Sequence, residues 1–127
     1  MRLRYLVVAV YGASAVNSLV KEVIARRRPH RAPRIATAGG YSFPSGHSTG
    51  STAIAFAVVA LLWASSRRYL AAPTAALGLL YAGFVGRSRV VLSEHHRGDV
   101  FAGWTLGLLW VAMVSWIFQR RHARPGS

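Results

Sequence analysis

Four long stretches of this sequence contain no Lys, Arg, Asp or Glu. They cover residues 5–20, 48–66, 69–86 and 100–119. A helix that crosses the hydrocarbon core of a bilayer needs about 20 mostly apolar residues, with roughly 17 to 25 as the usual range. Three stretches meet this length, and the first meets it together with the apolar residues that flank it. The sequence therefore predicts about four transmembrane helices.

The charge balance fits this reading. The 127 residues include 16 Lys and Arg against 3 Asp and Glu, yet 53% of the chain is hydrophobic. The basic residues lie between the uncharged stretches, where they would border a membrane rather than bind nucleic acid. A soluble bundle is disfavoured because so short a chain cannot bury four helices that are apolar on all sides. We predict an all-α, polytopic membrane bundle with one domain over residues 1–127 and a basic tail over residues 120–127.

The N-terminus allows one alternative. Basic residues, a short apolar stretch and Ala13-Ser14-Ala15 together resemble a cleavable signal peptide. Cleavage there would leave too little of the first stretch to span a membrane. The apolar character continues past Ala15 as far as Ile24, which favours an uncleaved first helix.

Four successive spans place the connections alternately on two faces. Residues 26–44 and 87–99 fall on one face, and Arg67, Arg68 and both termini fall on the other. The first face collects Lys21, Arg28, Ser45, His47, Arg89, His95 and Asp99. The remaining arginines divide almost equally between the faces, so the positive-inside rule does not orient the chain.

Each polar group on this face has two interpretations. Lys21 and Arg28 are seven residues apart, so on one helix, which Pro29 would end, they would share a face and converge on an anion. Basic residues at a membrane surface also commonly snorkel or bind lipid headgroups. Ser45 to His47 precede a span, where backbone N–H groups bind phosphate well, although Ser45 could simply cap that helix.

The same ambiguity applies to His95 and Asp99. Their spacing of four allows the carboxylate to hold the imidazole, although Asp99 could instead be the N-cap of the following helix, where the dipole favours an acid. The ambiguity decreases when the groups are taken together as three motifs. In the first motif, six residues separate Lys21 from Arg28-Pro29, and the second motif is Pro44 to His47. In the third motif, five residues separate Ser88-Arg89 from His95, and three separate His95 from Asp99. This order and spacing resembles the three-part signature of the type 2 phosphatidic acid phosphatase superfamily, which also contains vanadium haloperoxidases.

The resemblance implies metal-independent hydrolysis of a phosphate ester through a phosphohistidine, with no cofactor. His95 would be the nucleophile on phosphorus, and Asp99 would orient it. His47 would protonate the leaving oxygen and then activate the water. The resemblance assigns phosphate binding to Lys21, Arg28, Ser45, Gly46, Ser88 and Arg89. Three acids in the whole chain make a metal site unpromising, and neither Glu22 nor Glu94 acquires a role.

Membrane members of this family resemble six-helix proteins in which the lysine motif follows the third helix. Here it follows the first, so the chain resembles the family core without two leading helices. This implies a short form, a truncated start, or a partner such as a second copy or helper helices. The expected function is a multi-pass membrane phosphatase that acts on a lipid phosphate or diphosphate at an extracytoplasmic face, in the cytoplasmic membrane if bacterial. The alternative is a noncatalytic cationic membrane protein that binds anionic lipids.

Overall fold

The computed structural model describes residues 1–28, 40–92 and 94–123. These ranges form four α-helices: α1 (Arg2–Ile24), α2 (Gly46–Trp63), α3 (Ala71–Val91) and α4 (Arg97–Ala123), with a short 3-10 turn, η1 (Arg68–Leu70), before α3. Each long helix, with η1 counted with α3, is long and apolar enough to cross a membrane. The predicted all-α bundle with four transmembrane helices is therefore confirmed.

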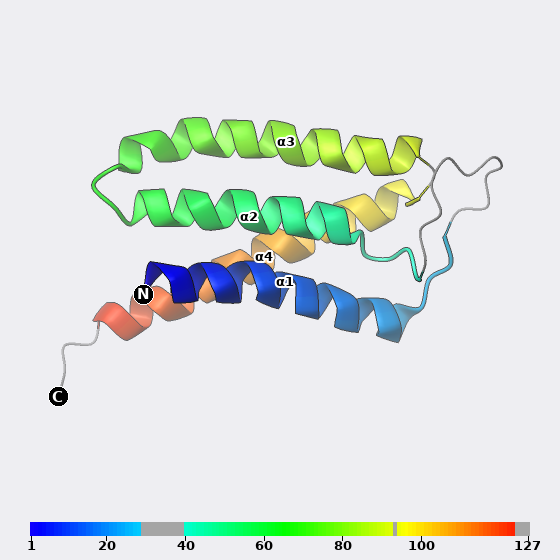
Figure 1. The fold of residues 1–127 in the computed structure, drawn as a ribbon, viewed down its shortest axis with the longest axis horizontal. Helices are drawn as coiled ribbons and strands as arrows, with labels where there is room; N and C mark the ends of the chain where they lie inside the picture. The colour runs from blue at the N-terminus through cyan, green and yellow to red at the C-terminus, as the bar shows by residue number, and fades with distance from the viewer. Residues whose placement is uncertain (29–39, 93, 124–127) are drawn as a thin grey trace.

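The helices alternate in direction and lie side by side (Figure 1). The start of α1, the end of α4 and the turn between α2 and α3 lie at one end of the bundle, which we call the terminal end. The end of α1, the start of α2, the end of α3 and the start of α4 meet at the opposite end, the loop end. The residues singled out by the sequence motifs therefore converge on the loop end, as alternation of four spans predicts.

Helix α2 is the central element and packs against the other three helices. Two glycines of α4 allow its closest approach: a Cβ on Gly103 would lie 2.6 Å from the carbonyl oxygen of Ser45, and one on Gly107 would lie 2.6 Å from that of Thr49. Residues four apart share one face of a helix, and small residues at this spacing let membrane helices pack backbone to backbone. This close packing fixes the start of α2 against α4.

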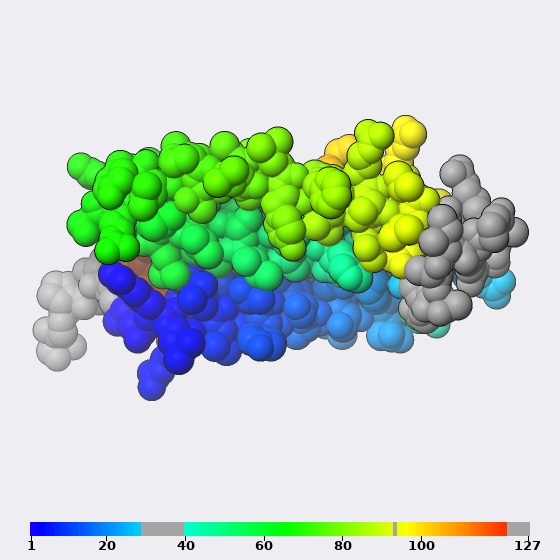
Figure 2. Space-filling model, turned by 45° about the horizontal axis from the view of Figure 1, so that its top comes forward, coloured from blue at the N-terminus to red at the C-terminus, as the bar shows by residue number. Residues whose placement is uncertain are grey.

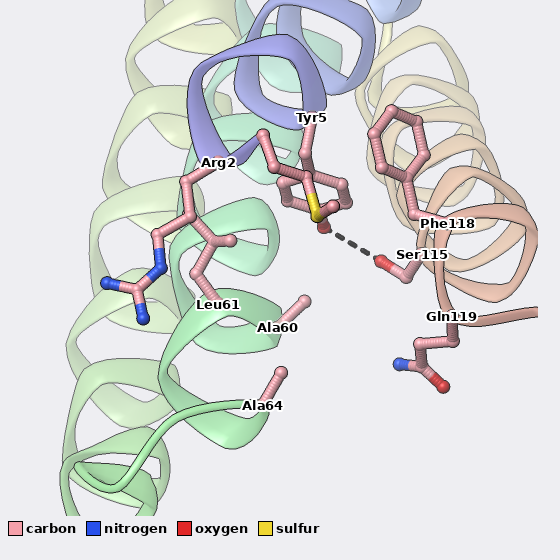
Figure 3. Close-up of a pocket in the computed structure, with 9 residues that line it drawn as sticks. Arg2, Tyr5, Ala60, Leu61, Ala64, Ser115, Phe118 and Gln119 are labelled. Atoms are coloured by element: carbon pink, nitrogen blue, oxygen red, sulfur yellow. Dashed lines mark hydrogen bonds between the residues drawn. The ribbon is translucent and has the colours of Figure 1, made fainter. Parts of the chain in front are cut away.

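The interior of the bundle differs along its length. Near the terminal end it is apolar, with a cluster of Tyr5, Ala9, Ala13, Ala53, Ala57, Val111 and Val114. Figure 3 shows the Tyr5 hydroxyl and the Ser115 hydroxyl hydrogen-bonded there, at 2.8 Å. Towards the loop end the interior also contains many buried polar residues: Asn17, Ser42, Ser45, Ser48, Thr49, Ser51, Thr52, Glu94, His95 and Asp99.

Two predicted helix ends are wrong. Helix α1 ends at Ile24, and Ala25 is left-handed with φ 50°, so Lys21 and Arg28 do not share a helix. The cause is distant in sequence: the carbonyls of Arg26 and Arg27 accept hydrogen bonds from the backbone N–H and hydroxyl of Ser42, at 2.7 and 3.0 Å. Pro29, expected to end this helix, lies outside the described residues.

At the other helix ends, the structure extends past the first charged residue. Helix α3 continues to Val91, so the residues from Arg87 onwards are helical rather than the start of a loop. Helix α4 begins at Arg97 and continues to Ala123, so residues 120–123 of the predicted tail are helical. Residues 124–127 lie outside the described part of the chain.

Candidate active site

A cleft of about 700 Å³ opens at the loop end. Its lining includes seven of the nine residues predicted from the sequence motifs: Lys21, Arg28, Gly46, His47, Ser88, Arg89 and His95. They come from α1, the segment after it, the start of α2, the end of α3 and the turn before α4. The other two, Ser45 and Asp99, are fully buried.

His95 is buried, and its ring orientation is set by a backbone carbonyl. Its Nδ1 lies 2.7 Å from the carbonyl oxygen of Ser42. A carbonyl can only accept, so Nδ1 carries the proton and Nε2 of the neutral ring keeps its lone pair. Nε2 lies 3.4 Å from Nη1 of Arg28, which can donate to it. The ring therefore has the tautomer in which Nε2 can act as a nucleophile.

The surroundings of His95 also keep the ring neutral. Burial, and then the positive charges of Arg28 and Lys21, lower the pKa of the His95 imidazole to about 4. The Ser42 carbonyl and the Asp99 carboxylate favour the protonated ring but do not outweigh these effects. Near pH 7 the imidazole is uncharged, which is the state that a nucleophile requires.

Asp99 holds the turn before α4. Its carboxylate accepts hydrogen bonds from the His96 backbone N–H at 2.7 Å and from Arg26 Nη1 at 3.1 Å. Helix α4 begins at Arg97, so Asp99 is its third residue and not the N-cap that the sequence also allowed. The bond to His96, just before the helix, resembles the return contact of a capping box. Asp99 Oδ2 lies 3.8 Å from His95 Nδ1, and the Ser42 carbonyl is the closer partner of that nitrogen. Asp99 thus acts on His95 mainly through its charge and through the turn that it holds.

Ser45 caps α2. Its hydroxyl accepts a hydrogen bond from the Ser48 backbone N–H at 3.3 Å, and its own N–H donates to the Asp99 carbonyl at 2.9 Å. The side chain is therefore used to start the helix, the simpler of the two interpretations of the sequence. Gly46 and His47, which follow it, line the cleft at the N-terminus of α2, where the helix dipole favours an anion.

Three cations of the cleft are held by oxygen atoms of other segments. Lys21 Nζ donates to the Tyr41 carbonyl at 3.2 Å, and Arg28 Nη1 donates to the Glu94 carbonyl at 2.8 Å. Arg89 Nη1 forms an ion pair with Glu94 Oε2 at 2.8 Å. Charges that reach the cleft from three segments and are already oriented can bind one phosphate group with little further ordering.

The chain is similar to known proteins of one family. The model of the PAP2 superfamily matches residues 2–123. The chain belongs to the PAP2 superfamily. Phosphatidylglycerophosphatase B of Bacillus subtilis (strain 168) is 34% identical over 113 residues, which are 86% of this chain and 55% of that protein. Lipid A 1-phosphatase of Rhizobium johnstonii is 33% identical over 125 residues, 91% of this chain and 48% of that protein.

A solved structure is also similar to this PAP2 protein. It is described as the crystal structure of the first transmembrane PAP2 type phosphatidylglycerolphosphate phosphatase from Bacillus subtilis. The TM-score is 0.80 at 29% identity, with 91% of this chain and 58% of that chain covered. The PAP2 protein described here thus spans about half the length of the two curated relatives that it matches. The family and the four apolar helices together make it a multi-pass membrane protein.

Sequence reasoning missed several residues around this cleft, among them Ser42, Glu94 and Asn17. The Ser42 carbonyl is a backbone group, so nothing in the sequence marks it. The sequence gives Glu94 no role, and the structure pairs it with Arg89. Asn17 is a buried amide within α1 that donates to the Thr49 hydroxyl at 2.9 Å and so ties α1 to the start of α2. A lone Asn inside an uncharged stretch was the available signal, because polar residues within membrane spans often have a function.

Proposed function

We propose that this PAP2 protein is an integral membrane phosphatase that hydrolyses a lipid phosphate or diphosphate through a phosphohistidine intermediate. One observation carries the proposal: the His95 ring, with Nδ1 held by the Ser42 carbonyl, lines the same cleft as Lys21, Arg28 and Arg89. A neutral nucleophile beside three fixed cations suits attack on an anionic phosphate.

In the first step, the Nε2 lone pair of His95 attacks phosphorus and forms an N–P bond while the ester P–O bond breaks. His47 acts in its protonated form and gives its proton to the leaving oxygen. Lys21, Arg28 and Arg89 stabilise the charge on the nonbridging oxygens, with help from the N-terminus of α2. Phosphoryl transfer requires mainly positioning and charge neutralisation, and these protein groups can supply both.

In the second step, water loses a proton to His47 and attacks phosphorus. The N–P bond breaks, and its electron pair returns to Nε2 of His95. The products are the alcohol and inorganic phosphate, and both imidazoles regain their starting states. Asp99 would favour the transient positive charge on His95 from 3.8 Å, and Arg26 and His96 hold its carboxylate in place.

A lipid substrate is supported by the position of the cleft. It lies at one end of four apolar helices, so a phosphate could enter it while its hydrocarbon remains in the bilayer. Two relatives are named for phosphatidylglycerophosphate and lipid A, which are also lipid phosphates. We propose phosphatidate, phosphatidylglycerol phosphate and polyprenyl phosphates or diphosphates as the substrate class. We place the cleft at the extracytoplasmic face of a bacterial cytoplasmic membrane, with residues 1–127 forming one phosphatase domain, alone or beside a second copy or helper helices.

The test is release of inorganic phosphate by the purified chain in mixed micelles, with EDTA present, from a panel of these lipid phosphates. The expected result is release by the parent and a loss of at least about 10³-fold in His95→Ala and His47→Ala. Ser115→Ala, altered at the terminal end, is the control and keeps parent activity. Release by His95→Ala at the parent rate would contradict the nucleophile assignment. A folded parent that releases nothing from any substrate would instead favour a noncatalytic protein that binds anionic lipids.

A further inference from the structure

The cleft that contains His95 has an apolar half as well as a cationic half. Beyond the catalytic groups, its lining continues along Gly50 and Ile54 of α2 and along Tyr81, Phe84 and Val85 of α3. We call these five residues the α2/α3 groove. The two helices are antiparallel neighbours (Figure 1), so residues 46–54 and 81–89 cover the same depth, about 12 Å at a rise of about 1.5 Å per residue. One cavity therefore runs from the cations towards the middle of the bundle.

The α2/α3 groove is open on its bilayer side. The side chains of Ile54, Tyr81 and Phe84 are 49%, 55% and 75% exposed. At Gly50 a Cβ would meet no atom within 4 Å, so the glycine leaves free space in the groove. The hydroxyl of Ser51, which also lines the cleft, donates to the Ser48 carbonyl of its own helix at 3.1 Å. On the face drawn in Figure 2, α2 is visible between α3 and α1.

We propose that the α2/α3 groove binds the hydrocarbon tail of the substrate whose phosphate occupies the cationic half of the cleft. This inference rests on the proposed function. A phosphate at Arg28 and Arg89 must direct the rest of its molecule out of the cleft, and the groove is the continuation of that same cavity. Its apolar, laterally open walls match a tail that stays in the bilayer and do not match a soluble phosphate.

We expect the α2/α3 groove to select substrates by whether their tails fit its shape. Lipid tails are as apolar as the groove, so moving a tail from bulk lipid into it gains little hydrophobic free energy. The groove instead provides space, because the free volume beside Gly50 lets a long chain lie along α2 while its phosphate stays near His95. Filling this space should exclude long tails and leave short-chain substrates unaffected.

Two glycines provide a matched test. Gly50 and Gly83 both lie within helices, and a Cβ on either would meet no atom within 4 Å. Only Gly50 lines the cleft with His95, whereas Gly83 lines two grooves on the α4 side of α3. Gly50→Leu should therefore obstruct the α2/α3 groove, and Gly83→Leu places the same side chain elsewhere.

The experiment compares hydrolysis of dioleoyl phosphatidate with hydrolysis of dibutyryl phosphatidate, which carries the same phosphate on much shorter tails. Gly50→Leu should lower kcat/KM for the dioleoyl substrate by about tenfold or more and change that for the dibutyryl substrate by less than about twofold. Gly83→Leu should leave both values near those of the parent. Phe84→Ala is a second variant, because its exposed side chain can be removed without a cavity in the core. It widens the groove, so it should not lower kcat/KM for either substrate, and a selective loss on the dioleoyl substrate would contradict selection by space.

The outcomes separate this inference from the proposed function. An active parent with equal losses on both substrates in Gly50→Leu, or with no loss on either, overturns the groove and leaves the phosphatase intact. A selective loss on the dioleoyl substrate in Gly83→Leu as well would also overturn the groove and leave the phosphatase intact. A folded parent that hydrolyses neither phosphatidate, nor any other lipid phosphate, overturns the proposed function and the groove together.

Discussion

The two halves of this bundle have similar helices and different interiors. Towards the terminal end, the core is built from small and aromatic side chains, and the Tyr5 and Ser115 hydroxyls form an uncharged hydrogen bond (Figure 3). Towards the loop end, the interior holds buried hydroxyls, an amide, an imidazole and two carboxylates. Cations occur at both ends, but Arg120 stacks on the exposed ring of Trp116 at 3.9 Å, whereas Arg89 pairs with buried Glu94.

This contrast explains why basic charge alone does not locate the site. By sequence, the two membrane faces carry nearly equal numbers of arginines outside the motifs. The loop end differs because its cations come from separate segments, are held by carbonyls and a carboxylate, and face one cleft with His95. Convergence and orientation of the charges, rather than their number, distinguish a phosphate site from a membrane border.

The largest expected effect comes from removing one arginine at each end. Arg28→Gln loses a charge that lies 3.4 Å from Nε2 of His95, so kcat/KM for a lipid phosphate should fall by about 10² to 10³. Arg120→Gln removes the same charge at the terminal end and should change kcat/KM by less than about twofold. Equal losses in the two variants would mean that net charge near the membrane, and not convergence at the cleft, determines activity.

The second effect is a pH dependence confined to the loop end. The pKa of His95 is about 4 in the folded chain and about 6.5 in an unfolded one. Between these values the unfolded state binds more protons, so the stability from neutral His95 is complete above pH 6.5 and is lost as pH falls towards 4. This contribution to the free energy of unfolding is about 3 kcal/mol at most. Unfolding free energies of the parent and His95→Gln, measured across this range, should converge at low pH; a constant difference would refute the buried neutral imidazole.

The third comparison is between Gly103, which packs closely against α2, and Gly83, which faces open space. In Gly103→Ala the new Cβ would meet the Ser45 carbonyl, a backbone atom that cannot rotate away, so we expect a loss of about 1 to 3 kcal/mol in unfolding free energy. Gly83→Ala enters open space and should stabilise the chain by about 0.5 to 1 kcal/mol. The measurement is denaturation in mixed micelles. Stabilisation by Gly103→Ala would show that α4 does not approach the start of α2 so closely.

The architecture was predictable because bilayer thickness sets the length of an uncharged stretch. The helix ends were less predictable, since α3 continues through Arg87 and Arg89, whose side chains can be accommodated at a membrane border. The end of α1 depends on hydrogen bonds from Ser42 to the carbonyls of Arg26 and Arg27. Contacts across a connection of this length are not encoded in the local pattern on which the prediction of one shared helix relied.

The candidate site, too, was predictable only in part. The motif spacing brought seven of the nine predicted residues to one cleft, because each motif lies at the loop end of a helix. Roles within the cleft depend on geometry: the Ser45 hydroxyl caps α2, and the Ser42 carbonyl holds Nδ1 of His95 at 2.7 Å. A backbone acceptor leaves no trace in a list of side chains, so the partner of the nucleophile could be identified only from the fold.

The smallest expected effect tests the terminal end directly. Tyr5→Phe removes one hydroxyl from its 2.8 Å contact with Ser115 and leaves the aromatic ring against Phe118. Hydrogen bonds between membrane helices contribute about 0.6 kcal/mol on average, so the unfolding free energy should fall by about 1 kcal/mol or less. A tyrosine hydroxyl does not titrate in the acidic range, so this decrease should be the same at pH 4 and pH 7, and phosphate release should match the parent. A clear loss of release in Tyr5→Phe would mean that the two halves are coupled through α1 and that the site is not confined to the loop end.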